Sequence, residues 1–192
     1  ALIDATSGVH FVTSYSPYFA QDLIRIKLSE FKPVDTVKNR ELTRLCKDAD
    51  RLVAWRTKGE FWGKQRAVIV TFNPRTAAKQ RYGFDKKLSS LQETVLDLKE
   101  KVKSQKPHWT DADRIKAHYV EACQKLYLPK DLFDISLERY KKKWRLLARR
   151  NYYRIGLYIE KFGKNIIVTD RSEWTTDEIV QASLDRYMVE SA

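Results

Sequence analysis

The chain has 192 residues, of which 43% are hydrophobic and 12% aromatic, and its formal net charge at pH 7 is +12. This content excludes an intrinsically disordered chain, because such chains lack the apolar area that offsets the loss of chain entropy. The longest apolar runs are strand-sized, well below the about 20 residues that span a bilayer, and the N-terminus shows no signal-peptide core. Cys46 and Cys123 match neither a disulfide framework nor a zinc spacing. We therefore expect a soluble, cytoplasmic protein without a membrane partner.

The N-terminal part of the chain predicts strands followed by a helix. The alternating, β-branched segment 9–16 predicts a strand. Segments 51–57 and 65–72 flank the sequence KGEFWGK, whose two glycines predict a β-hairpin with one of the longer loops. Asn73 and Pro74 then supply an N-cap and a first helical residue that needs no donor, so we expect a helix to begin there.

Two apolar stripes predict an antiparallel helical hairpin over 75–127. The first stripe follows a coiled-coil spacing and consists of Phe84, Leu88, Leu91, Val95, Leu98 and Val102. The second follows a capping pair expected at Thr110 and Asp113 and consists of Ala112, Ile115, Tyr119, Ala122 and Leu126. These stripes can pack on each other, on a sheet or on a second copy of the chain. A homodimer through the helices 75–127 is therefore one expected assembly.

The positive charge is concentrated in the later part of the chain. Residues 130–171 hold twelve Lys and Arg against five Asp and Glu, whereas residues 172–192 hold one against five. In the segment 139–154, RYKKKWRLLARRNYYR, bases interleave with aromatics, which suits contacts with nucleic-acid phosphates. The DNA-binding candidates here are Lys141, Lys142, Lys143, Arg145, Arg149 and Arg150. The alternative is an ordinary solvated surface of Lys and Arg side chains.

The C-terminal part predicts two strands and two helices. A basic strand, helix and strand fill 139–170, with the strands at 143–149 and 164–170. Thr175 and Glu178 then form a capping box, which predicts a helix over 176–192.

One face of this last helix is expected to meet the core through Ile179, Leu184 and Tyr187. Arg186 and Glu190 are four residues apart and share another face. Spacing alone fits an exposed ion pair without a functional role.

The segment FGKNIIVTDRSEWTTDEIVQASLDRYMVE, residues 162–190, resembles the C-terminal segment of bacterial insertion-sequence transposases with an Asp-Asp-Glu active site. These are the transposases of insertion-sequence family four and its relatives, whose signature is Tyr-x-x-Arg-x-x-x-Glu-x6-Lys. Arg186 and Glu190 match the Arg and Glu of that signature, and Ser183 stands where the Tyr is expected. The Lys would lie beyond Ala192.

Two earlier blocks carry the same resemblance. HFVTSYSPYFAQDL at 10–23 and RLVAWRTKGEFWGKQRAVIVTFNPRTAAKQR at 51–81 are similar to the strand and hairpin that precede the catalytic Glu in this group. The resemblance therefore extends over most of the chain.

The resemblance implies an α+β chain, a partial ribonuclease-H-like transposase core with a large mixed insertion domain. Residues 1–16 would hold the last strand of the core. Residues 17–170 would form the insertion domain, with the β-hairpin 51–72, the helical hairpin 75–127 and the basic unit 139–170. Residues 171–192 would be the catalytic helix, truncated.

The resemblance also implies a chemistry. The parent enzyme would cleave DNA and transfer strands at transposon ends, with about three carboxylates holding two Mg²⁺ ions, or Mn²⁺. Glu190 would be the third catalytic carboxylate and a metal ligand, and Arg186 would contact DNA. The two catalytic Asp residues would precede this chain, since Asp4 lies too close to His10 to be the second one. We therefore expect the chain alone to bind DNA, to be inactive and to hold no metal.

Two other classes of protein stay open. A non-enzymatic nucleic-acid-binding module would work through 139–154, with Glu190 an ordinary surface acid, and would show steep salt dependence without a metal requirement. An interaction domain built on the helices 75–127 would form a dimer that Leu91→Asp together with Leu98→Asp disrupts.

Overall fold

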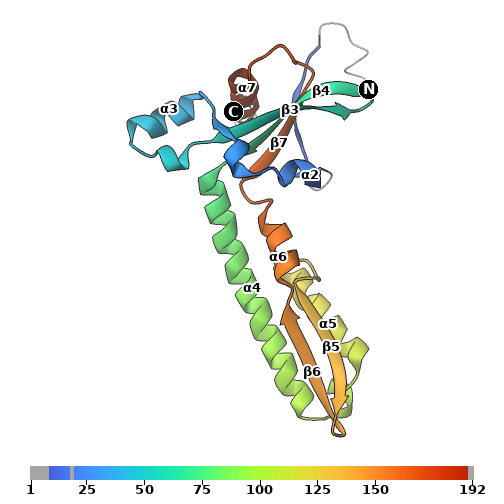
Figure 1. Cartoon of the computed structure of the whole chain (residues 1–192). Helices are drawn as coiled ribbons and strands as arrows, with labels where there is room; N and C mark the ends of the chain where they lie inside the picture. Colours follow the sequence, from blue (N-terminus) through green and yellow to red (C-terminus); the bar gives the residue numbers. More distant parts are fainter. Residues whose placement is uncertain (1–8, 18–19, 190–192) are drawn as a thin grey trace. The chain divides into compact units, whose positions relative to one another are not determined.

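The computed structural model describes residues 9–17 and 20–189, with side chains in the last helix described up to Arg186. It shows an α+β protein with two compact units (Figure 1). Unit 1 comprises Ala1–Lys79 and Glu160–Ala192, and unit 2 comprises Gln80–Ile159. The strand Val12–Tyr15, the hairpin within 51–72 and the strand Lys164–Thr169 all share one sheet in unit 1. This division differs from the expected one, which assigned the hairpin and the later strand to an insertion.

Unit 1 is built on a five-stranded antiparallel sheet with the order β1-β7-β4-β3-β2. The strands are β1 (Val12–Tyr15), β2 (Lys32–Pro33), β3 (Val53–Phe61), β4 (Lys64–Phe72) and β7 (Lys164–Thr169). The adjacent strands β4 and β7 are rich in Val and Ile, residues that favour a pleated, packed backbone. Both strands are buried over most of their length, and they form the centre of the unit.

Each face of this sheet carries its own apolar core, because successive side chains of a strand point to opposite faces. The described α-helices that lie wholly in unit 1 are α2 (Gln21–Ile24), α3 (Val37–Arg44) and α7 (Thr176–Val189). Ile179 and Val180 of α7 pack with Ile69 and Ile167 on one face. Ile24 of α2 and Phe31 complete the other core, which also contains Val68, Val70, Ile166 and Val168. The sheet is thus covered on both sides by short helical segments.

Unit 2 combines helices with a two-stranded sheet. Its elements are most of α4 (Pro74–Lys103), α5 (Ala112–Leu126), β5 (Phe133–Tyr140), β6 (Lys143–Arg150) and α6 (Tyr152–Ile159). The strands β5 and β6 pair in antiparallel register and run beside α4 and α5 (Figure 1). No described helix is both long and apolar enough to cross a bilayer.

The predicted apolar stripe of α4 is buried inside unit 2. All six of its residues are buried, and Leu91 is 0% exposed. Phe84 stacks on Tyr158 of α6 with ring centroids 5.1 Å apart, and Ile115 of α5 and Leu146 of β6 are also buried in this unit. The stripe therefore has its partners within the chain, which removes the reason for expecting a homodimer through the helices 75–127.

Several local predictions are confirmed by hydrogen bonds. The Thr76 N–H donates to the Asn73 side chain at 3.0 Å, so Asn73 caps α4. The Thr175 N–H donates to the Glu178 carboxylate at 2.7 Å, and the Glu178 N–H donates to the Thr175 hydroxyl at 3.2 Å, as the capping box requires.

Other predictions are wrong in detail. The hairpin β3–β4 has no long loop, because its strands extend to a two-residue turn at Trp62 and Gly63, both with positive φ. The cap of α5 is Asp111, whose carboxylate accepts two backbone N–H bonds, rather than Thr110. Leu184 is 36% exposed, whereas Ser183 is buried in its place.

Gly163, which follows unit 2 in the sequence, is hydrogen-bonded to Asn73, which precedes unit 2. Its carbonyl accepts a 2.8 Å bond from the Asn73 N–H, and its φ is +71°. A Cβ at this position would lie 2.6 Å from the Asn73 carbonyl oxygen and 2.7 Å from the Ala77 Cβ. Only glycine therefore fits here, for both backbone conformation and space.

We expect Gly163→Ala to lower the free energy of unfolding by at least about 2 kcal/mol, since left-handed strain and overpacking add. Gly63→Ala is the matched control, because Gly63 has φ +74° but nothing within 4 Å of its Cβ position. This control should cost only about 1 kcal/mol. Urea unfolding of both variants measures the difference, and equal losses would contradict the close packing at Gly163.

Candidate nucleic-acid interface

The candidate interface is the tip of the β5–β6 hairpin in unit 2. Tyr140 pairs with Lys143 across a two-residue turn, and the turn residues Lys141 and Lys142 have φ values of 45° and 67°. Such turns normally use Asn-Gly, because a side chain in the left-handed region costs about 1–2 kcal/mol per residue. Stored backbone strain of this kind supports the hypothesis of a functional role for the turn. In this protein the strained turn places Lys141 and Lys142 at the exposed end of the β5–β6 hairpin.

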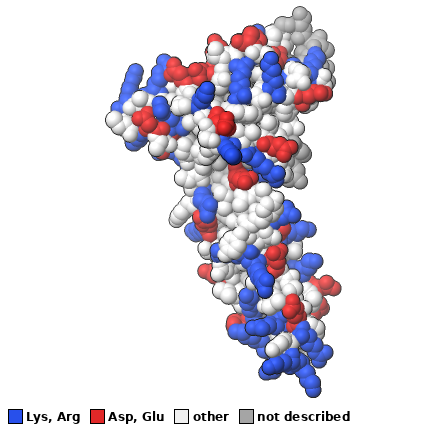
Figure 2. All heavy atoms as spheres, in the orientation of Figure 1, with Lys and Arg blue, Asp and Glu red and all other residues white. Residues whose placement is uncertain are grey.

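The charge at this tip is uncompensated. Residues 139–150 contain no Asp or Glu, and Figure 2 shows Lys and Arg gathered at this end of unit 2. The exposed bases of the hairpin are Arg139, Lys141, Lys142, Lys143, Arg145 and Arg149. Within the part of the chain that the structure describes, none of these six forms an ion pair. The tip is therefore available to an external anion.

Aromatic rings lie among these bases. The Lys141 ammonium lies 5.4 Å from the ring centre of Tyr140, which is 58% exposed. The Arg139 guanidinium lies 5.9 Å from the Trp144 ring centre. The tip thus combines cations with exposed aromatic surface, as nucleic-acid-binding surfaces often do.

Arg150 differs from the other DNA-binding candidates. It is half-buried, and its guanidinium donates a hydrogen bond to the side chain of Gln92 on α4. The structure therefore gives Arg150 a packing contact at the base of the hairpin, far along the strand from the turn.

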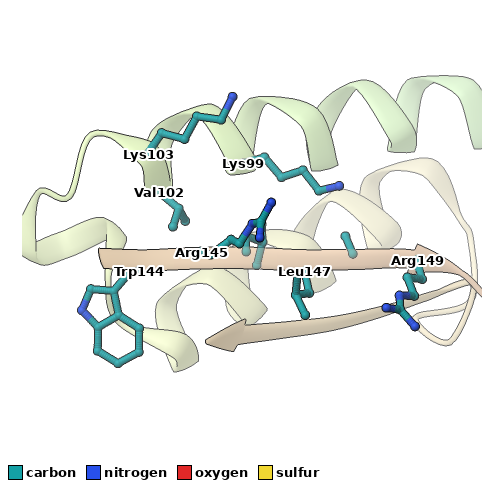
Figure 3. Close-up of a pocket in the computed structure, with 9 residues that line it drawn as sticks. Lys99, Val102, Lys103, Trp144, Arg145, Leu147 and Arg149 are labelled. Atoms are coloured by element: carbon teal, nitrogen blue, oxygen red, sulfur yellow. The ribbon is translucent and has the colours of Figure 1, made fainter. Parts of the chain in front are cut away.

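A groove of about 310 Å³ lies beside the hairpin, between α4 and β6. It is lined by Lys99, Val102, Lys103 and residues 144–149. Figure 3 shows Lys99 and Lys103 projecting from α4 above β6, with Trp144 at one end and Arg149 at the other. Sequence reasoning does not find these two lysines. Their only signal is their position, each one residue after a buried stripe residue, Leu98 or Val102.

The remaining predicted site residues belong to unit 1. Arg186 lies on α7 and is half-buried, so it is not part of the basic hairpin. Glu190 and Asp4 lie outside the described residues. The DNA-binding candidates are thus divided between two units.

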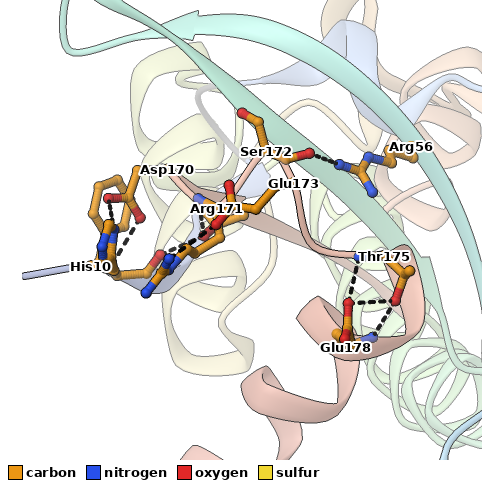
Figure 4. A network of polar contacts seen from close by, with 10 residues as sticks. His10, Arg56, Asp170, Arg171, Ser172, Glu173, Thr175 and Glu178 are labelled. Atoms are coloured by element: carbon orange, nitrogen blue, oxygen red, sulfur yellow. Dashed lines mark hydrogen bonds and ion pairs between the residues drawn. The ribbon is translucent and has the colours of Figure 1, made fainter.

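The start of α7 is held by a polar network that links β7 to the helix (Figure 4). Arg56 of β3 donates to the carbonyls of Ser172 and Trp174 at 2.7 and 2.6 Å. Backbone and hydroxyl hydrogen bonds from Thr175 hold the pKa of the Glu178 carboxyl below its usual value. These contacts fix the loop from which α7 starts.

Asp170 ties the same loop to the segment before β1. Its carboxylate accepts from the Phe11 N–H at 3.0 Å and from His10 Nδ1 at 2.9 Å. Burial alone would raise the pKa of Asp170, but these two hydrogen bonds outweigh burial and hold that pKa below its usual value.

A metal site is not assembled by the described residues. Among residues 9–17 and 20–189, no three His, Cys, Asp or Glu side chains lie close enough together to hold a metal ion. These residues therefore do not fit the two-metal centre that the resemblance implies for Glu190, and we assign them no catalytic step through a metal.

Comparisons with protein-family models, with curated proteins and with solved structures gave no match.

We expect Asp170→Asn to lower the free energy of unfolding at pH 7 by about 0.5–1 kcal/mol, because the variant loses the ionised carboxylate that accepts from the Phe11 N–H and from His10 Nδ1. Since the folded-state pKa of Asp170 is lowered, its contribution is present above the unfolded pKa of about 3.9. It is lost as the pH falls through the folded value. Urea unfolding at pH 7 and about pH 3 should therefore show the difference between wild type and variant shrinking.

The matched control is Glu173→Gln, which removes an exposed carboxylate that pairs with Arg171 at 3.0 Å in the same loop. We expect no measurable loss from this change. A difference for Asp170→Asn that is as large at about pH 3 as at pH 7 would contradict the assigned role of the carboxylate.

Proposed function

We propose that this chain is a DNA-binding part of an insertion-sequence transposase with an Asp-Asp-Glu active site, whose parent cleaves and joins DNA ends. The observation that carries the DNA-binding half of this proposal is the hairpin tip. It holds Lys141, Lys142 and Lys143 at a strained turn, exposed and without ion pairs among the described residues.

A hairpin of this kind suits duplex DNA on two grounds. The major groove admits a two-stranded β-ribbon, and β5–β6 is such a ribbon with cations at its end. Lysines act as point charges on phosphates and release condensed counterions, which gives binding without base readout. The expected binding is therefore weak, sequence-independent and strongly salt-dependent.

The transposase half of the proposal is supported by how α7 packs. In the resemblance, the last core strand and the catalytic helix are neighbours although an insertion separates them in sequence. In unit 1, α7 lies against β1, and Val12 packs on the same core as Ile179 and Val180. The partial ribonuclease-H-like core would then comprise β1 and α7, with Arg186 in the last part of the helix.

Ser183 bears on this proposal as well. It stands at the signature's Tyr position and is 6% exposed, so this part of α7 faces the interior of unit 1. A buried side chain cannot contact DNA, and Arg186 is the signature residue of the described helix left to do so.

A second candidate is a DNA-binding module without catalytic function. The same hairpin supports it, and Glu190 would then be an ordinary acid. The two candidates differ in what surrounds this chain in the full protein.

The DNA-binding proposal is tested by charge reversal. Replacing Lys141, Lys142 and Arg145 by Glu should weaken binding to a short labelled duplex and flatten the slope of log K against log salt. The slope should change by about 0.9 for each phosphate that is no longer neutralised. Fluorescence anisotropy at several NaCl concentrations measures it.

Two matched variants exclude trivial causes. Lys38, Lys47 and Lys58 are exposed lysines of unit 1, and their replacement by Glu makes a comparable change in charge but should leave the slope unchanged. Lys141→Asn with Lys142→Gly relieves the turn strain and should stabilise unit 2 while still weakening binding. If the hairpin and control reversals lower the slope equally, the DNA surface does not lie on the hairpin.

The transposase proposal is tested on the gene. Codons for a Lys seven residues after Glu190 should be present, as the signature requires. Upstream of Ala1, strand-like apolar stretches should each end in an Asp. A reading frame with neither feature, even in decayed form, would favour the non-catalytic module.

A further inference from the structure

The outer edge of β6 is open along part of its length. In an antiparallel pair, residues alternate between bonding to the partner strand and directing their N–H and C=O groups away from it. The Asn151 N–H donates to the Leu132 carbonyl at 2.9 Å, and this bond fixes the alternation. The residues of β6 that bond to β5 are therefore Lys143, Arg145, Leu147 and Arg149.

Trp144 confirms this assignment. Its N–H donates to Gln105 Oε1 at 2.7 Å, and its carbonyl accepts from Gln105 Nε2 at 2.9 Å, so both groups point away from β5. Gln105 thus bonds to the outer edge of β6 as an extended peptide group would.

Leu146 and Ala148 continue this outer edge without such a partner. In the described part of the chain, no hydrogen bond from a side chain or a neighbouring segment reaches their outward N–H and C=O groups. Leu146 is only 5% exposed. An unpaired backbone group in such a place costs about 1–3 kcal/mol, and native structures pair nearly all of them. The outer edge of β6 can therefore form further hydrogen bonds at Leu146 and Ala148.

The groove of about 310 Å³ between α4 and β6 opens along this segment. Lys99 and Lys103 line it from the helix, and Arg145 and Arg149 line it from the strand. No Asp or Glu is among its lining residues, although Glu100 of the same helix pairs with Lys103 at 2.5 Å. The other three bases, Lys99, Arg145 and Arg149, form no ion pair within the described part of the chain, so an occupant of the groove should carry negative charge.

The hydrogen-bond donors and acceptors on the outer edge of β6 indicate which class of molecule can bind in the groove. Leu146 and Ala148 each offer one N–H and one C=O, which another extended peptide backbone satisfies completely. A DNA backbone brings only acceptor oxygens, which would face the two carbonyls unfavourably, and the 2′-hydroxyls of RNA do not reproduce the alternating N–H and C=O groups of a strand. We propose that an extended acidic peptide segment of a partner protein adds to β6 as a third strand, in the groove beside α4.

This proposal uses a different part of the hairpin from DNA binding at the tip. The tip uses the turn lysines, whereas the peptide uses the outer backbone edge of β6 and the lysines of α4, and Arg145 and Arg149 belong to both surfaces. The variants at Lys99, Lys103 and Ala148 leave the turn lysines intact, so either proposal can fail without the other.

The probe is a short fluorescein-labelled peptide of alternating valine and glutamate, with blocked ends. It should bind, as measured by fluorescence anisotropy, and should slow amide hydrogen exchange at Leu146 and Ala148 in wild-type protein. The same peptide with every backbone amide N-methylated cannot donate to the edge in either register and should not bind. Lys99→Glu with Lys103→Glu should abolish binding of the acidic peptide.

Ala148→Pro removes one outward donor at a position where an edge strand tolerates proline. Peptide affinity should fall by about tenfold or more, while Ala148→Val, which keeps the N–H, should bind normally. DNA binding should be unchanged in both variants.

Three outcomes would overturn the proposal. The first is unchanged exchange at Leu146 and Ala148 in the presence of peptide, a result that does not depend on any variant folding. The second is equal binding of the N-methylated peptide. The third is protection of the same two amides by a single-stranded oligonucleotide and not by the peptide, which would assign the groove to nucleic acid.

Discussion

The architecture of unit 1 depends on β7 being paired on both of its edges. Val12–Tyr15 bonds to one edge and Ala67–Phe72 to the other, although both segments lie far from β7 in the sequence. The strand can hold this place because its residues Ile166, Ile167 and Val168 are almost fully buried, alternately on both faces of the sheet. The strand β7 follows unit 2 in the sequence. The core of unit 1 is therefore completed only by residues that come after the whole of unit 2.

This constraint explains how unit 2 is accommodated between β4 and β7 in the sequence. Unit 2 begins within α4 and ends after α6, and the bond from Asn73 to Gly163 closes the two ends on each other. Beyond β7, the loop to α7 is held from three directions by Asp170, Arg56 and the capping box. The direction in which α7 leaves the sheet is therefore set by contacts in unit 1. The position of a functional residue near the end of α7 would therefore be determined by unit 1 and not by unit 2.

Much of this fold can be predicted from local chemistry, and the rest depends on strand pairing. The capping residues Asn73 and Thr175 act through bonds that span three residues, so their motifs suffice. The stripe on α4 is recognisable for the same reason, but its partners are not, because spacing does not specify which surface covers an apolar face. The strand β5 alternates Phe133, Ile135 and Leu137, yet it escapes prediction since its turn is formed by two lysines without the glycine that marks most tight hairpins. The open edge at Leu146 is beyond sequence reasoning altogether, because it follows from the register of that unrecognised hairpin.

The hairpin of unit 2 is stabilised by the burial of Phe133 and Leu146 and by side chains that bond to its margins. A two-stranded ribbon is marginal by itself, and here its outer edges are held at few points. The Tyr119 hydroxyl accepts from the Phe133 N–H at 3.2 Å on the β5 side, and Gln105 bonds to Trp144 on the β6 side. Between Trp144 and Arg150, α4 approaches through lysine side chains, which leave the backbone edge uncovered. A chain optimised only for stability would cover that edge and use glycine in the turn. The hairpin does neither, so its exposed charge and its unpaired edge are better explained by what it binds than by how it folds.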